Sequence, residues 1–173
     1  MNIGVVIMAL FGAAWCGWGL WLWSGAAGPW LAIPVLVTGA LLVGQGLVRR
    51  VPVDPAVRKR AARMFGIASA GEGVMLGVAI GILYGIDRFD LAPHAMAAIV
   101  GLHFIPPAWL IPAHRYFAVA AASLLLVIVA TTALNEPLQA IAICLGMAIL
   151  LWTAAASLVI SPVGRATRDT QSV

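Results

Sequence analysis

Residues 138–160 read LQAIAICLGMAILLWTAAASLVI and contain no charged side chain. An α-helix needs about 20 apolar residues to cross the roughly 30 Å hydrocarbon core of a bilayer, so this segment has the character of a transmembrane helix. The rest of the chain resembles it, because 63% of the 173 residues are hydrophobic and only 9% are charged. Soluble domains carry about 25% charged residues. The composition therefore excludes a soluble domain and a disordered chain, and it predicts an integral membrane protein.

Five further apolar runs of similar length predict an all-α, polytopic membrane protein with a bundle of six transmembrane helices. The expected helices cover residues 3–23, 29–48, 64–85, 92–112, 116–134 and 138–160. Together they form a single domain, residues 1–160, followed by a polar cytoplasmic tail at 161–173. Asp54 before Pro55 has the order of an N-cap and a first helical residue, so the third helix is expected to begin at Pro55, in the cytosol. Asp90 is expected to cap the fourth helix.

The basic residues are distributed unevenly across this topology. With both termini inside, only Arg88 of the ten Lys and Arg residues lies outside. Short loops rich in Lys and Arg stay in the cytoplasm, which predicts cytoplasmic termini in a bacterial inner membrane. One cytoplasmic cluster is also a candidate contact for anionic lipids: Arg49, Arg50, Arg58, Lys59, Arg60 and Arg63. This placement explains the net charge of +4 without a nucleic-acid partner.

The third expected helix carries a regular stripe of small residues. Its members recur every four residues: Ser69, Gly73, Gly77, Gly81 and Gly85. Small residues at this spacing allow a second helix to approach closely in a membrane. We expect the stripe to pack tightly inside the bundle, with the seam of a homodimer as the alternative.

Two ionisable residues lie within the apolar runs. Glu72 is eight residues beyond Met64, about 12 Å deep, and His103 is nine residues before Pro112, about 13 Å deep. Consecutive antiparallel helices are usually adjacent, so the two side chains are expected to meet inside the bundle. Ionisable groups at such depth normally face protein or a water-filled cavity. A neutral Glu and a core His that only form hydrogen bonds are the structural alternative.

Other residues extend this candidate polar site. Pro106 and Pro107 have no N–H group, so the carbonyls of Leu102 and His103 lose their helical partners, and a break is expected at 105–107. Hydroxyl groups at similar depth complete a possible polar layer: Thr38, Ser123 and Thr153. No cofactor or metal is expected, because the three His residues lie on or beside one helix and no His/Cys cluster is present.

Residues 101–106 read GLHFIP, and Glu72 lies one helix earlier. This combination resembles a pattern in small bacterial six-helix integral membrane proteins. The resemblance covers mainly the third and fourth expected helices, about a third of the chain. It implies that the polar spot is a shared feature of such proteins, and it implies no activity.

Three functions are compatible with these residues. The first is a small transporter or channel-like protein for a small solute or ion, with Glu72 and His103 as a proton-linked pair. The second is a non-catalytic membrane protein that assembles with a partner or stabilises it. An intramembrane lipid-modifying enzyme is the third, and no sequence motif of a known catalytic site favours it. A hydrated cavity at Glu72 and His103 would favour transport, whereas exposed small residues along the third helix would favour a partner.

Overall fold

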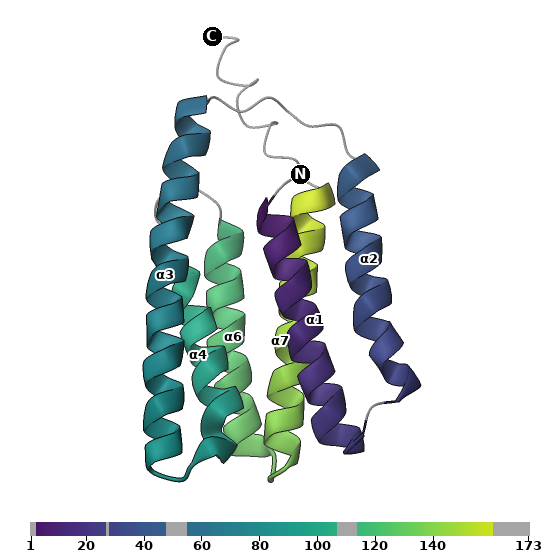
Figure 1. Cartoon of the computed structure of the whole chain (residues 1–173), viewed down its shortest axis with the longest axis vertical. Helices are drawn as coiled ribbons and strands as arrows, with labels where there is room; N and C mark the ends of the chain where they lie inside the picture. The colour runs from purple at the N-terminus through teal and green to yellow at the C-terminus, as the bar shows by residue number, and fades with distance from the viewer. Residues whose placement is uncertain (1–2, 27, 48–54, 107–113, 161–173) are drawn as a thin grey trace.

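The computed structural model describes residues 3–26, 28–47, 55–106 and 114–160, and this part of the chain is all-α (Figure 1). The helices are α1 (Ile3–Ser24), α2 (Ala32–Leu47), α3 (Pro55–Gly85), α4 (Ala92–His103), α6 (His114–Ala133) and α7 (Leu138–Ile160). Short 3-10 turns, η1 (Pro29–Leu31) and η2 (Phe89–Leu91), precede α2 and α4. Four helices, α1, α3, α6 and α7, are long and apolar enough to cross a membrane.

The helices stand side by side in the order α3, α4, α6, α7, α1 and α2 (Figure 1). The contact between α1 and α7 is the most extensive, and α7 also packs against α2, α4 and α6. At one edge, α3 packs against α4 and η2, and no residue of its apolar segment is fully buried. The core therefore lies around α7, and α3 is a peripheral helix.

Glycines and one shared carbonyl bring α1, α2 and α7 together. A Cβ atom added at Gly12 would lie 2.6 Å from the indole of Trp152. The Nε1 group of Trp152 donates to the carbonyl of Ala9 at 3.1 Å, and the hydroxyl of Thr38 donates to the same oxygen at 3.1 Å. Hydrogen bonds between membrane helices contribute about 0.6 kcal/mol each, so close packing dominates this junction.

The structure corrects several expected helix boundaries. The fourth helix was expected to span 92–112, but α4 ends at His103, after only 12 residues. Pro106 explains the early end, because it cannot donate to the carbonyl of Leu102. The second expected helix, 29–48, is divided into η1 and α2, and its apolar part is shorter than the four candidate spans. The structure therefore supports four candidate spans rather than six complete ones.

The expected helix starts have different outcomes. The expectation that the third helix begins at Pro55 is confirmed, although Asp54 lies outside the described residues. The expectation that Asp90 caps the fourth helix is wrong, because α4 follows Leu91 and has no side-chain cap. The Asp90 carboxylate instead accepts hydrogen bonds from the guanidinium of Arg88, the shortest at 3.1 Å. The Asp90 carboxylate therefore pairs with the Arg88 guanidinium rather than with the N-terminal N–H groups of α4.

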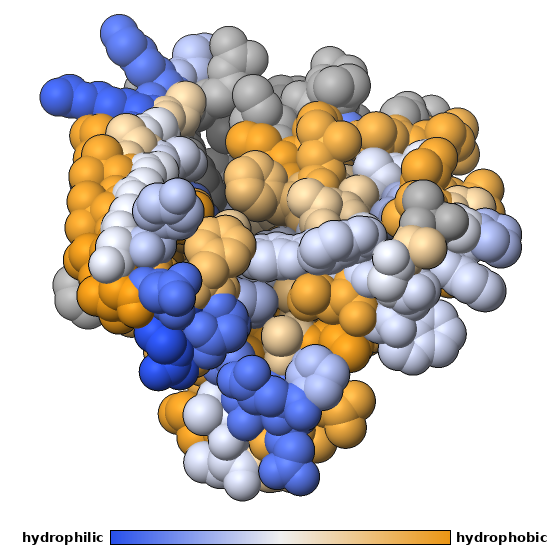
Figure 2. Space-filling model, turned by 60° about the horizontal axis from the view of Figure 1, so that its bottom comes forward, coloured by the Kyte–Doolittle hydropathy of each residue, from blue (hydrophilic) through white to orange (hydrophobic). Residues whose placement is uncertain are grey.

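The surface is apolar along the helices and polar at one end. Large apolar side chains are exposed on several helices, including Val35 (70%), Val74 (67%) and Ile149 (59%). In Figure 2 the end of the molecule with the α6–α7 connection faces the viewer. Hydrophilic residues gather at this end, and hydrophobic residues lie beside them. Trp23 and Trp30 lie at the α1–α2 connection at this same end, with ring centroids 5.8 Å apart. This distribution suits a protein whose helix flanks contact lipid.

Candidate functional site

The structure brings Glu72 of α3 and His103 of α4 together. The Nδ1 atom of His103 lies 3.3 Å from Oε2 of Glu72, and the two side chains are only 9% and 13% exposed, respectively. The residues come from different helices and are separated by 31 positions in the sequence, so helix packing creates the contact. It is the closest contact between ionisable groups on the apolar helices in the described part of the chain.

The register of α3 places Glu72 on the side that meets α4. The partly buried residues of this segment recur every three or four positions: Ala68, Glu72, Leu76, Ala79 and Leu83. Since each residue advances about 100° around a helix, these residues share one face. α4 packs on that face, which shields the carboxylate from the surroundings.

The end of α4 positions His103. The N–H of Phe104 bonds to the carbonyl of Gly101 at 3.2 Å, a tightened last turn. Gly101 also allows α4 to approach α6, because a Cβ atom there would lie 3.0 Å from Cβ of Ser123. The imidazole is therefore held where the helix terminates. The interruption lies at Phe104, and Ile105 and Pro106 are again helical, so the expectation that the break begins at Ile105 is wrong by one residue. Pro106 is exposed, and Pro107 lies outside the described residues.

The contact between Glu72 and His103 is short but imperfectly aligned. Although Nδ1 of His103 is buried and 3.3 Å from the carboxylate, their relative angle is not that of a hydrogen bond, and Nδ1 lacks a hydrogen-bond partner. Attraction between unit charges at 4 Å is about 4 kcal/mol at an effective dielectric constant of 20. Desolvating two ions costs several kcal/mol, so burial between two helices opposes this attraction. The structure thus places two groups that can each bind a proton in contact between α3 and α4.

The other predicted polar residues do not join this pair. Thr38 donates to the carbonyl of Ala9, whereas Ser123 and Thr153 donate to carbonyls of their own helices. Ser123 is fully buried, while Thr153 is exposed. The expected layer is therefore a set of separate hydroxyl groups, because Ser123 and Thr153 donate within their own helices while Thr38 donates to α1.

The expectation that the glycine stripe packs inside the bundle is wrong. Among the described residues, no atom lies within 4 Å of Cβ atoms added at Gly73, Gly77, Gly81 or Gly85, and Ser69 is exposed. Gly77 is five residues beyond Glu72, which places it about 140° away around the helix. Because α4 occupies the Glu72 side, the stripe faces away from the chain. The homodimer alternative stays a prediction.

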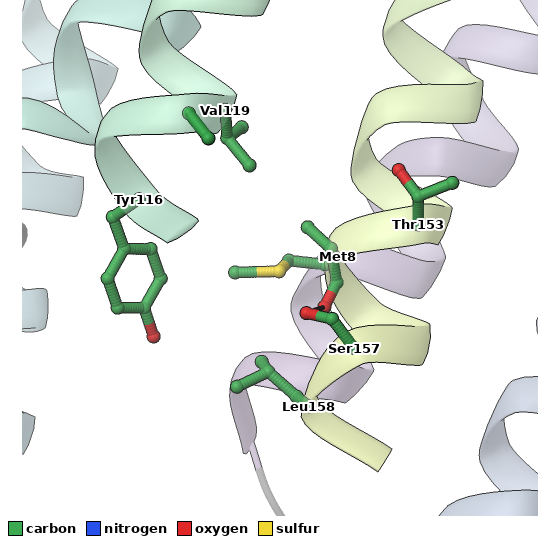
Figure 3. Close-up of a pocket in the computed structure, with 8 residues that line it drawn as sticks. Met8, Tyr116, Val119, Thr153, Ser157 and Leu158 are labelled. Atoms are coloured by element: carbon green, nitrogen blue, oxygen red, sulfur yellow. Dashed lines mark hydrogen bonds between the residues drawn. The ribbon is translucent and has the colours of Figure 1, made fainter. Parts of the chain in front are cut away.

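A pocket of about 190 Å³ lies between α1, α6 and α7 (Figure 3). The sequence does not reveal it. Its lining is mainly apolar, and Tyr116, Thr153 and Ser157 are the members that carry a hydroxyl group. The other lining residues are Met8, Ala118, Val119, Ala154 and Leu158. Tyr116 stacks on Phe104, the residue after His103, with ring centroids 6.2 Å apart. Phe104 also contacts His103, with ring centroids 5.5 Å apart, so a row of ring contacts connects His103 to the pocket lining at Tyr116.

The proposed lipid-contact residues are only partly described. Lys59 and Arg63 are exposed on the first turns of α3. Arg58 and Arg60 belong to the same helix, but their side chains lie outside the described part of the structure, as do Arg49 and Arg50 entirely. The described basic side chains are thus accessible to a headgroup.

Comparisons with protein-family models, with curated proteins and with solved structures give no match to this chain. Fold and site alone define its class. The described part of the chain is all-α, with four helices long and apolar enough to cross a membrane and a shielded Glu–His pair between two of its helices.

Proposed function

We propose that this chain is a small transporter or channel-like protein for a small solute or ion, and that proton exchange at Glu72 and His103 drives or gates its movement. The observation that carries the proposal is the 3.3 Å contact between these shielded side chains. Ionisable residues within membrane helices typically mark ion pathways and proton relays.

The location of the pair suggests how a proton would act. α3 packs against α4 and η2, and α4 ends at His103 itself. A change in the charge of either side chain alters the attraction between these two helices. Because α3 has few other contacts, such a change is expected to move α3 relative to α4 rather than to disturb the core around α7.

The proposal includes six membrane-crossing segments, with both termini in the cytoplasm of a bacterium. The distribution of Lys and Arg supports this orientation. η1 and α2 together extend from Pro29 to Leu47, which approaches the length of a span. α4 is about 18 Å long, so a complete crossing requires the residues after His103 as well.

Glu72→Gln tests the proton-linked function, because it preserves the shape of the side chain and removes its titration. Proteoliposomes containing a pH-sensitive dye would report proton entry under an imposed membrane potential. We expect wild-type protein to admit protons and Glu72→Gln to lose this flux while remaining folded. Glu136→Gln, the same change at an exposed position outside the helices, is the matched control. Equal flux in wild type and Glu72→Gln would contradict the proposal.

A second function is favoured by a different observation. The glycine face of α3 is open, with no atom of the described chain within 4 Å of Cβ positions at Gly73, Gly77, Gly81 and Gly85. Such a face is typical of membrane helices that pack against another helix. We therefore retain assembly with a partner, including a second copy of this chain, as the alternative function.

A further inference from the structure

We infer that the pocket between α1, α6 and α7 binds an acyl chain of an anionic phospholipid. The pocket lies where the α6–α7 hairpin opens. At Gly146, eight residues beyond the start of α7, the arms are close, since a Cβ atom there would lie 2.6 Å from the side chain of Leu126. The pocket is lined by the start of α6, at Tyr116, and the end of α7, at Ser157 (Figure 3). The antiparallel arms therefore diverge away from their connection and leave space between them.

The chemistry of the lining selects a hydrocarbon chain. The described lining carries no charged side chain, so a charged solute would lose its hydration there without compensation. The hydroxyl of Ser157 donates to the carbonyl of Ala154 at 2.7 Å, and that of Thr153 donates to the carbonyl of Ile149 at 2.9 Å. These donors are already used within α7, and the remaining surface is nearly apolar. An apolar cavity of about 150 Å³ holds a benzene ring, so 190 Å³ accommodates several methylene groups.

The depth of the pocket opening indicates that the hydrocarbon chain comes from a lipid of the surrounding bilayer. Ala118 and Thr153 line the pocket and are exposed, which places its mouth on the outer surface of the helices. Thr153 is seven residues before the end of α7 at Ile160, a distance of about 10 Å along the helix axis. At that depth beside a membrane-crossing helix, the surrounding medium is the acyl region of the bilayer rather than water. A phospholipid can insert a chain laterally and keep its headgroup at the membrane surface.

Charge complementarity specifies the headgroup. The pocket lies toward the end of the molecule where α3 begins (Figure 1), and the described charged side chains there, Lys59 and Arg63, are both basic. The opposite end carries the acidic residues Asp87, Asp90 and Glu136 beside a single arginine. Each basic residue near a membrane surface contributes about 1 kcal/mol to the binding of anionic lipid, which is close to a fivefold preference. An anionic phospholipid therefore fits both the pocket and the adjacent surface.

Native mass spectrometry of the purified full chain tests this inference, with phosphatidylglycerol and phosphatidylcholine of identical acyl chains as probes. We expect one phosphatidylglycerol to be retained, with about 25-fold weaker retention of phosphatidylcholine, since Lys59 and Arg63 each contribute about fivefold. Ala154→Phe fills the pocket and should weaken retention of phosphatidylglycerol by about tenfold, the effect of excluding two methylene groups. Ala121→Phe, at an exposed position of α6 outside the pocket, is the matched control and should bind as wild type does.

Three results would overturn the inference. Ala154→Phe could retain phosphatidylglycerol as wild type does, the two lipids could bind equally, or the protein could form a lipid-free dimer in which a second copy fills the pocket. If Ala154→Phe does not fold, wild-type protein is instead crosslinked to phosphatidylglycerol that carries a photoreactive group in its acyl chain. Crosslinks at Met8, Val119 or Leu158 support the assignment. Crosslinks spread evenly over exposed apolar residues of α2 and α3 contradict it.

Discussion

Replacement of Gly12 by alanine tests the closest contact in the helical core. The added Cβ atom would lie 2.6 Å from both Cδ1 and Nε1 of Trp152, so the indole has to move. Its movement breaks the 3.1 Å hydrogen bond from Nε1 to the carbonyl of Ala9. Overpacking costs about 1–3 kcal/mol, and loss of the interhelical bond costs about 0.6 kcal/mol. Alanine regains about 1 kcal/mol through its higher helix propensity, which leaves a net destabilisation of about 0.6–2.6 kcal/mol.

Reversible unfolding in detergent micelles, followed by circular dichroism, measures this cost. Gly77→Ala is the matched control, because its added Cβ meets nothing within 4 Å, and this variant should be as stable as wild type or more stable by about 1 kcal/mol. In a Trp152→Phe background the smaller ring relieves the clash, so Gly12→Ala should cost less there. If Gly12→Ala is as stable as Gly77→Ala, the proposed packing of α1 on α7 is incorrect.

Three further predictions address the outer face of α3, the polar end of the molecule and its orientation. Gly77→Leu should leave the melting temperature of the monomer unchanged, because the site is open, and should reduce any dimer seen by crosslinking in membranes; an unaffected dimer would exclude the stripe as its seam. Hydrogen bonds from Arg88 lower the pKa of Asp90 below its ordinary value of 3.8, so this pair stabilises the fold at neutral pH and its contribution disappears in acid. Asp90→Asn should therefore melt below wild type at neutral pH, and the two curves should converge as the pH falls below 3.8; parallel curves at every pH would contradict this. For topology, Ala26→Cys avoids the positive φ of Gly25 and should react with an impermeant thiol reagent from outside, whereas Gln171→Cys should react only after permeabilisation.

Much of the fold follows from the length of the apolar runs, and the exceptions have local causes. Residues 138–160 combine sufficient length with the absence of proline, and α7 has the same limits. The expected helix at 92–112 has equal apolar length, but Pro106 removes a hydrogen-bond donor and α4 ends at His103. Hydropathy measures only transfer to lipid, so it cannot distinguish an unbroken helix from an interrupted one. Backbone hydrogen bonding decides that difference.

The Glu72–His103 contact could be predicted because the depth of a residue in the membrane depends only on its position along its helix. Counting residues from the membrane surface placed both groups at one level. Because consecutive antiparallel helices are usually adjacent, the two side chains were expected to meet. The pocket could not be predicted in this way, because it depends on how far α6 and α7 diverge. That angle results from packing along the whole hairpin, including the close approach at Gly146. No local sequence signal at Tyr116 or Ser157 encodes it.

The glycine stripe shows why periodicity alone does not identify a packing partner. A repeat of four residues defines which side chains share a face of α3, and the structure leaves that face open. The same helix positions Glu72 about 140° from Gly77, so one face meets α4 while the other faces outward. A partner helix seated on the glycines would therefore hold α3 without touching the Glu72–His103 pair. Since α3 packs against little else, such a partner would restrain the helix whose movement we expect protonation to control. Assembly and proton exchange are thus compatible in one molecule, and each can be removed without directly altering the residues of the other.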